Sequence, residues 1–226
     1  MEENLFTKAD VGHVVGSFEQ RIMLKRFPGK PIRNIPLYIY KMLPENIEKD
    51  FSKRKDIVFV SGFNHAPNKD GVIWFAKEVF PKVVEKYPDI IWHIVGSNVP
   101  DEIIRLGSRN IKIDGFLSDE QLEALYRSCR LAVVPLRYGA GVKGKVVEAA
   151  YNQIPLVTTS IGGEGLDKSV GAFLVEDDAM KMSVVINAVY SDFNRLRKIS
   201  DSGKVFIEKY FTLDRAKEVI LEDMGD

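Results

Sequence analysis

The sequence predicts an α/β fold in which helices flank a parallel β-sheet. Short runs of consecutive apolar residues, such as 56–60 and 131–134, are typical of strands that are buried on both faces. Segments with apolar residues at helical spacing follow them, and 72–86 is the clearest of these. Because strands that alternate with helices form βαβ units, their sheet is expected to be parallel.

The first forty residues indicate a few short elements and then a charged connection. Residues 11–16 are a candidate strand and 18–26 a candidate helix, with a proline- and glycine-rich break after them. The next candidate strand, 32–40, is interrupted by Pro36, which has no amide hydrogen to donate. Charged residues dominate the segment that follows, and we expect 41–55 to be a linker.

A regular pattern begins at residue 56. Apolar runs indicate the strands and helical periodicity indicates the helices, while 61–71 is expected to be a loop. Ser118 with Gln121 forms a capping box, and Thr212 suits the N-cap of the last helix. The predicted strands are 56–60, 90–95, 111–113, 131–134, 155–159 and 172–175, and the predicted helices are 72–86, 118–128, 144–151, 178–190, 193–209 and 212–223.

The site is expected at one edge of this sheet. In parallel sheets ligands bind beyond the carboxyl ends of the strands. The loops after Val60, Ile113, Val134 and Thr159 all open on that edge. The pattern divides the chain into an N-terminal segment, 1–40, the linker, 41–55, a ligand-binding domain, 56–210, and a C-terminal helix, 211–226.

Composition excludes several classes of protein. Hydrophobic residues make up 45% of the 226 and charged residues 28%, as in ordinary soluble domains. The 32 basic and 32 acidic residues balance, so no general nucleic-acid surface is expected. No apolar run could cross a bilayer, and the first residues do not resemble a signal peptide. The single cysteine, Cys129, is expected to be buried in a helical stripe; we expect a cytoplasmic protein without a metal site.

A glycine-rich loop after the strand 131–134 is the most informative motif. It contains Gly139, Gly141 and Gly144, and glycine lets a backbone approach a ligand closely. The same spacing occurs in dinucleotide sites, but there the loop follows the first strand of the domain. Here it follows the fourth, and the next strand ends without an acidic residue for a ribose. The sequence therefore disfavours an NAD site.

Charged residues beside this loop suit a phosphate and a sugar. Lys143 and Lys145 flank a glycine at a helix start, where lysines and backbone N–H groups favour phosphate. Glu148 lies one turn further on in an otherwise apolar helix, where a carboxylate can accept hydrogen bonds from ribose hydroxyls. We predict Lys145 and Glu148 as catalytic residues. The alternatives are solvated lysines, and a carboxylate held by a lysine or a backbone cap.

Other loops at the same edge supply candidate donor contacts. Gly62 brings backbone near a ligand, Phe116 could face a nucleobase, and Arg137 precedes the glycine loop. Glu164 lies in a glycine-rich turn that could cradle an anion or only reverse the chain. For Phe116 the alternative is inward packing. His65 is expected to be an ordinary loop histidine, and Asn68 could simply cap the following helix.

Three segments together resemble the donor-binding half of a GT-B glycosyltransferase of group 1, or family 4. They run from Gly62 through Pro67-Asn68 to Pro81, from Val133 to Ala149, and from Pro155 to Leu166. The resemblance implies a Rossmann-like domain that binds a UDP- or GDP-linked sugar without cofactor or metal. It also implies transfer with retention at the anomeric carbon, and it assigns the ribose hydroxyls to Glu148.

Two further comparisons with the family pattern concern the sugar and the acceptor. The family has a second glutamate eight positions before Glu148 that touches the donor sugar, and Ala140 stands there. Residues 9–19 resemble the last strand of the acceptor domain, and Ile35-Pro36 resembles the crossover into the donor domain. The resemblance therefore implies a chain that lacks most of the acceptor half. The helix at 212–223 resembles the one that packs on that half.

Two functions are open at this point. The first is a glycosyltransferase donor domain that takes a nucleotide-sugar donor. Its acceptor would be an unknown glycan, a lipid-linked or a small molecule, and peripheral membrane contact is compatible with it. The second is a non-catalytic nucleotide-binding or interaction module of the same fold, which Ala140 favours. Inverting GT-B enzymes and sugar-nucleotide epimerases fit the segment 139–148 less well.

Overall fold

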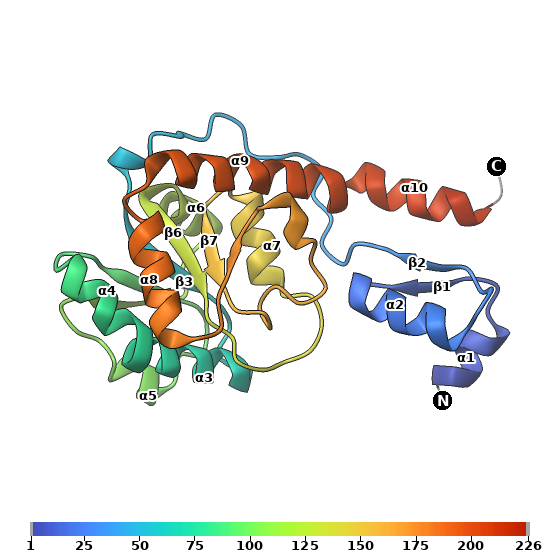
Figure 1. Cartoon of the computed structure of the whole chain (residues 1–226), viewed down its shortest axis with the longest axis horizontal. Helices are drawn as coiled ribbons and strands as arrows, with labels where there is room; N and C mark the ends of the chain where they lie inside the picture. The colour runs from blue at the N-terminus through green and yellow to red at the C-terminus, as the bar shows by residue number, and fades with distance from the viewer. Residues whose placement is uncertain (1, 225–226) are drawn as a thin grey trace.

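The structure, a computed structural model, describes residues 2–224 and is shown in Figure 1. Residue 1 of the predicted segment 1–40 and residues 225–226 of the segment 211–226 lie outside this range. A six-stranded, wholly parallel sheet forms the centre of the larger part and confirms the predicted fold class. Its order is β5 (Ile111–Gly115), β4 (Trp92–Val95), β3 (Lys55–Val60), β6 (Cys129–Val134), β7 (Leu156–Thr158) and β8 (Leu174–Val175).

Helices cover both faces of this sheet (Figure 1). They are α3 (Ala66–Trp74), the π-helical turn η2 (Phe75–Val79), α4 (Phe80–Lys86), α5 (Asp101–Ile104), α6 (Asp119–Ser128), α7 (Gly144–Tyr151), α8 (Ala179–Val189) and α9 (Phe193–Tyr210). One core lies between the sheet and α3, α4 and α8, where Ile57 and Trp92 are fully buried. The other lies under α6 and α7, where Val58 is fully buried. Neighbouring residues of β3 thus enter opposite cores, which explains its continuous apolar run.

Several boundaries differ from the sequence prediction for local reasons. The first helix of the domain begins at Ala66, because Pro67 fits the first turn of a helix, where its missing N–H is not needed. Only the first half of the predicted loop 61–71 is therefore loop. The strand predicted at 32–40 ends at Asn34, shortly before Pro36. Cys129 is buried as predicted but begins β6 instead of lying in a helix, and burial raises the pKa of its thiol to about 12.

The N-terminal segment forms a small unit beside the larger part (Figure 1). It contains α1 (Glu2–Lys8), β1 (Gly12–Val14), α2 (Ser17–Arg26) and β2 (Ile32–Asn34), with β1 and β2 parallel. The last helix, α10 (Leu213–Met224), extends from the end of α9 toward this unit. On α10, Asp223 lies 2.6 Å from Nε of Arg33 and 2.7 Å from Nε2 of His13. Ion pairs thus join the two parts.

The segment predicted as a linker lies against the larger part. It contains the short 3₁₀ turn η1 (Phe51–Lys53), in which Phe51 is buried in the first core. Just before that turn, Lys49 donates to Oε1 of Gln153 at 2.8 Å and to Oγ of Ser200 at 2.6 Å. Nearer the N-terminal unit, Tyr40 forms an isolated parallel bridge with Thr212. Contacts of Lys49 and Phe51 within the linker, and of Tyr40 just before it, therefore fix this connection.

A buried histidine links three strands of the sheet. Nδ1 of His93 on β4 lies 2.8 Å from Oδ2 of Asp114 on β5, and its Nε2 lies 3.8 Å from Oδ2 of Asp56 on β3. Lys112 is a further partner of Asp114, at 2.7 Å. Burial lowers the pKa of His93, but the hydrogen bonds and charges of the two carboxylates outweigh burial, so that the pKa is raised.

We expect the folded protein to lose stability as the pH rises through the raised pKa of His93. The charged imidazole contributes fully below about pH 6.5, the pKa of an unfolded histidine, and this contribution disappears when the folded imidazole loses its proton. The free energy of unfolding, measured in urea from about pH 5.5 to about pH 9, should fall over this window. His93→Gln should remove this component of the pH dependence. An identical pH dependence in both proteins would contradict the assignment.

Candidate functional site

A cavity at the carboxyl ends of β3 and β4 contains several of the predicted residues, and we name it the strand-end cleft. Its volume is about 1120 Å³, and its lining includes Gly62, Phe116, Lys145 and Glu148. Gly62 follows β3, Phe116 follows β5, and Lys145 and Glu148 lie on α7. The ring of Phe116 is 79% exposed, so the alternative of inward packing is wrong. The cleft therefore offers backbone, an open aromatic ring, an ammonium group and a carboxylate to one ligand.

Lys145 is held in the wall of the cleft at the start of α7. Its Nζ donates to Oδ1 of Asn68 at 2.6 Å and lies 6.0 Å from the centre of the Phe59 ring. Burial and then the charge of Lys143 lower the pKa of Lys145 to about 8, and the charge of Glu148 acts in the opposite direction. A partly desolvated ammonium attracts an anion more strongly than a solvated one.

Asn68 is the residue that the sequence interpretation misjudged. It does not occupy the N-cap of α3, which is His65, but lies inside the first turn and is 4% exposed. Its Nδ2 donates to the carbonyl of Gly62 at 2.6 Å while its Oδ1 accepts from Lys145. In the sequence, an asparagine after a proline at a helix start gives the same signal whether it caps the helix or reaches across to another loop.

Glu148 lies one turn along α7 from Lys145, where the helix faces the cleft. Burial raises the pKa of its carboxyl group, and the charge of Asp119 adds to that effect. A hydrogen bond with Tyr126 and the charge of Lys145 oppose it. Tyr126 is a buried residue of α6, and both it and Glu148 line the cleft, so Glu148 has a protein partner without being turned away from the cleft. The carboxylate is therefore positioned as well as accessible.

Residues just after Ile35-Pro36 form a further wall of the cleft, which could not be predicted from the sequence. The ring of Tyr40 stacks on that of Tyr151 with centroids 3.9 Å apart and planes 11° apart. Tyr38 lies so close to Gly144 that a Cβ there would be 2.5 Å from its hydroxyl oxygen. Tyr38 and Tyr40 both line the cleft. A glycine at the start of α7 therefore allows the ring of Tyr38 to approach this closely.

Other predicted donor residues lie outside the lining of the cleft. Arg137 pairs with Asp70 on α3 through two hydrogen bonds, of which that from Nε measures 2.8 Å. Lys143 donates to the carbonyl of Gly141 in its own loop. Gly139 and Gly141 have φ angles of +115° and +80°, which favour glycine. The structure thus separates Lys145, which faces the cleft, from Lys143, which stabilises the loop.

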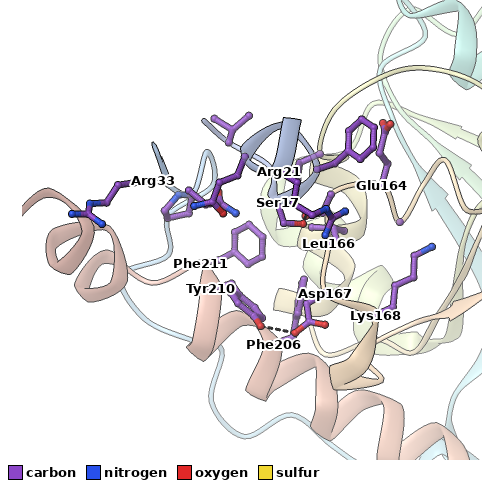
Figure 2. A pocket seen from close by; sticks show the side chains of 18 of the residues that line it. Ser17, Arg21, Arg33, Glu164, Leu166, Asp167, Lys168, Phe206, Tyr210 and Phe211 are labelled. Atoms are coloured by element: carbon purple, nitrogen blue, oxygen red, sulfur yellow. Dashed lines mark hydrogen bonds between the residues drawn. The ribbon is translucent and has the colours of Figure 1, made fainter. Parts of the chain in front are cut away.

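A second cavity, of about 880 Å³, lies between the N-terminal unit and the larger part (Figure 2). Ser17 of α2 lines it on one side and Glu164 on the other. Figure 2 shows the hydroxyl of Tyr210 donating to Asp167, at 2.5 Å, and this bond is the main cause that lowers the pKa of Asp167 to about 2. Glu164 lies 3.2 Å from Lys143 and is therefore near the glycine loop but not in the strand-end cleft.

The glycine-rich turn 162–165 is shaped by packing. A Cβ at Gly162 would lie 1.9 Å from Oγ1 of Thr158, and one at Gly163 would lie 2.9 Å from the ring of Phe173. The N–H groups of both glycines donate to Thr159, to its Oγ1 and its carbonyl respectively. Since these donors are already used, the geometry favours a plain turn over an anion cradle.

Comparison with known proteins agrees with this arrangement. A family model described as "Glycosyl transferases group 1" matches residues 54–192, more than half of the chain. The chain belongs to this family. The match begins just before β3 and ends just before α9, so it includes the whole six-stranded sheet as well as Lys145 and Glu148 of the cleft. The resemblance noted in the sequence is confirmed.

Relatives of this group 1 glycosyltransferase chain are longer than it is. An uncharacterized 44.6 kDa protein in the cps region of Klebsiella pneumoniae is 29% identical in an alignment 191 positions long, which covers 76% of this chain and 49% of the relative. TarM of S. aureus, solved with UDP and α-GlcNAc-glycerol, has a TM-score of 0.75 at 17% identity, over 98% of this chain and 45% of TarM. The chain thus spans about half the length of these relatives.

Two other solved structures share the fold. Anabaena HepE, in complex with UDP, has a TM-score of 0.73 at 16% identity, over 99% of this chain and 65% of HepE. Sucrose-phosphate synthase of Thermosynechococcus elongatus has a TM-score of 0.71 at 19% identity, over 99% of this chain and 59% of the synthase. The common fold is that of the GT-B glycosyltransferases. Within residues 2–224 of our chain, no helix has the length and apolar character needed to cross a membrane.

Proposed function

We propose that the strand-end cleft binds a nucleotide diphosphate sugar and that this chain is the donor-binding part of a retaining glycosyltransferase of family 4. The observation that carries the proposal is the meeting of Lys145 and Glu148 with Gly62 and the open ring of Phe116 in one cleft. The structures of TarM and HepE that share this fold hold UDP, which supports the same class of ligand.

Each of the lining residues suits a different chemical part of such a donor. The ring of Phe116 offers a face for the base, and the carboxylate of Glu148 accepts hydrogen bonds from the ribose hydroxyls. The ammonium of Lys145 neutralises charge on the diphosphate, and the backbone N–H of Gly62 donates a hydrogen bond to it. In the reaction an acceptor hydroxyl attacks the anomeric carbon through an oxocarbenium-like state, the bond to the diphosphate breaks, and the hydroxyl proton passes to the departing diphosphate. Charge develops on the leaving diphosphate, so that Lys145 contributes most in the transition state.

The remaining predicted donor residues belong on the sugar side of the proposed site. Four of them lie in the loop between β6 and α7, which leads from the cleft toward the second cavity, where Glu164 lies. We propose that the sugar extends in that direction. We propose a glycan, a lipid-linked molecule or a small molecule as acceptor, and a cytoplasmic location with peripheral membrane contact allowed. The residues proposed on the sugar side are Arg137, Gly139, Gly141, Lys143 and Glu164.

Thermal unfolding with added ligands tests the proposal. The chain should be heated with UDP, GDP or ADP, and separately with the nucleoside of each. A ligand at a hundred times its Kd stabilises the folded chain by about 2.7 kcal/mol, which raises the Tm of a domain of this size by roughly 5–10 °C. At least one diphosphate should raise the Tm more than its nucleoside does. If none of the three diphosphates raises it, the proposed function is wrong.

Glu148→Gln should weaken a nucleoside and its diphosphate by the same factor, about tenfold. The amide keeps the shape of the side chain but loses the charge that strengthens hydrogen bonds from the ribose hydroxyls. Titration calorimetry with the best-binding pair of ligands measures both factors. Glu120→Gln on the exposed side of α6 is the control and should bind both ligands like the wild type. A loss confined to the diphosphate would show that Glu148 does not hold the ribose.

A non-catalytic nucleotide-binding module is the second candidate function, and Ala140 favours it. The residue lies between two glycines of the loop, and its methyl group can make no hydrogen bond to a sugar. A full-length protein that binds the nucleotide diphosphate but neither transfers nor hydrolyses the sugar would support this candidate over the first.

A further inference from the structure

Asn68 occupies a position that is unusual for an asparagine in a helix. It is 4% exposed in the first turn of α3, between the loop at Gly62 and the start of α7. Polar side chains that are buried to this degree are expected to have their hydrogen-bonding groups satisfied. Both groups of this amide are satisfied, and each partner belongs to the strand-end cleft: Gly62 through its carbonyl and Lys145 through its ammonium.

These two partners need a side chain that both donates and accepts, and an amide does so with two separate atoms. A carbonyl oxygen can only accept, and an ammonium group can only donate, so the residue between them must donate at one end and accept at the other. A carboxylate could not donate to Gly62, and an apolar side chain of this size would leave Lys145 without its acceptor and the carbonyl of Gly62 with only the long hydrogen bond from Oγ of Ser61, at 3.4 Å. Because the ammonium can only donate and the carbonyl can only accept, Oδ1 of Asn68 faces Lys145 and Nδ2 faces Gly62, each at 2.6 Å.

We propose that Asn68 is a positioning residue, which holds the ammonium of Lys145 beside the backbone of Gly62 where the diphosphate is bound. This inference rests on the proposed function. It adds that the loop after β3 and the start of α7 act as one unit, because one side chain connects them. Without that connection Lys145, a long and flexible side chain, would have to be ordered by the diphosphate itself, which weakens binding.

The first test is a double-mutant cycle on the complete chain. Asn68→Ala should weaken binding of the nucleoside diphosphate about tenfold, with little change for the nucleoside, in calorimetry with UDP, GDP and ADP and their nucleosides. In the background of Lys145→Ala the same substitution should cost less than about twofold, because Asn68 acts through Lys145. Asn64→Ala, an exposed asparagine of the same loop, is the control and should match the wild type.

The second test follows the pH at which the diphosphate affinity falls. In the wild type this midpoint should lie near the pKa of Lys145, about 8. Asn68→Ala removes an acceptor that favours the charged amine and should move the midpoint down, whereas the carboxylate of Asn68→Asp should move it up. A purely structural role would not shift the midpoint in opposite directions. Both variants retain the other ionisable groups near Lys145 or in the lining of the cleft. These are Tyr38, Tyr40, Glu45, His65, Asp119, Glu123, Tyr126, Arg127, Lys143, Glu148 and Tyr151.

The outcomes separate this inference from the proposed function. If Lys145→Ala weakens the diphosphate selectively, and Asn68→Ala adds the same loss in both backgrounds, the positioning role is wrong and the proposed function stands. The positioning role is also wrong if Asn68→Ala does not weaken diphosphate binding at all. If no diphosphate binds to the wild type, both are wrong. Where Asn68→Ala lowers the Tm too far for calorimetry, Asn68→Asp, which keeps the shape and the acceptor, carries the pH test instead, and a midpoint that does not rise above that of the wild type would overturn the positioning role.

Discussion

Lys145→Ala should weaken binding of the nucleoside diphosphate by roughly ten- to a hundred-fold and leave the nucleoside almost unaffected. The reason is the position of the ammonium, which is partly desolvated at the start of α7 and has Asn68 as its hydrogen-bond acceptor. A charge in such a place interacts with an anion more strongly than a surface charge does. Calorimetry with nucleoside, monophosphate and diphosphate measures the three losses. The loss should also shrink as salt is added, because screening weakens attraction between charges.

Lys143→Ala is the matched control for this prediction. Lys143 is two residues away, has the same charge and donates to the carbonyl of Gly141 in its own loop. Its replacement should reduce diphosphate binding far less, although sugar-bearing donors are expected to respond. Equal losses for all three ligands in Lys145→Ala would show that this lysine does not bind the diphosphate.

Gly96→Ala should destabilise the whole protein by about 3 kcal/mol or more. Gly96 follows β4 in the floor of the cleft, and a Cβ there would lie 1.6 Å from the carbonyl oxygen of Ser61. The neighbour is backbone, so it cannot turn aside as a side chain would. The strand end of β3 would have to move, together with the loop that contains Gly62. Thermal unfolding should show a Tm lower by roughly 6–12 °C.

Gly62→Ala provides a comparison within the same cleft. A Cβ at Gly62 would meet only Oγ of Ser97, at 3.5 Å, which is an ordinary contact. We therefore expect its Tm to stay within a few degrees of the wild type, even where ligand binding changes. Similar Tm values for the two variants would mean that the close approach of Gly96 to Ser61 is not a constraint on the fold.

The elements that could be predicted from the sequence are those whose signals are local. Strands β3 and β6 are buried on both faces, and such strands leave a continuous apolar run in the sequence. The capping box of Ser118 and Gln121 is formed with both of its bonds, and Thr212 accepts from the N–H of Arg215 at 3.2 Å as an N-cap. Each of these depends only on residues a few positions apart.

The features that could not be predicted depend on contacts between distant segments. Lys143 and Lys145 are equivalent in the sequence, because both flank Gly144, and only the fold directs one into the cleft and the other back to its loop. The stacking of Tyr40 on Tyr151 joins residues that are far apart in the chain. The glycine spacing predicted the place of the site, but not which of the neighbouring charges enter it.

The pairing of Tyr40 with Thr212 has a consequence for how this protein can be rearranged. The N–H of Tyr40 donates to the carbonyl of Phe211 at 2.8 Å, and the N–H of Leu213 donates to the carbonyl of Tyr40 at 3.2 Å. The chain therefore passes into and out of the sheet-bearing part at a single place. Segments whose ends meet at the surface tolerate transplantation, because no gap has to be spanned. Apart from Tyr38, the whole lining of the strand-end cleft lies between these ends. The region between Tyr40 and Thr212 is thus a unit that recombination could join to a different N-terminal domain, with the cleft kept intact.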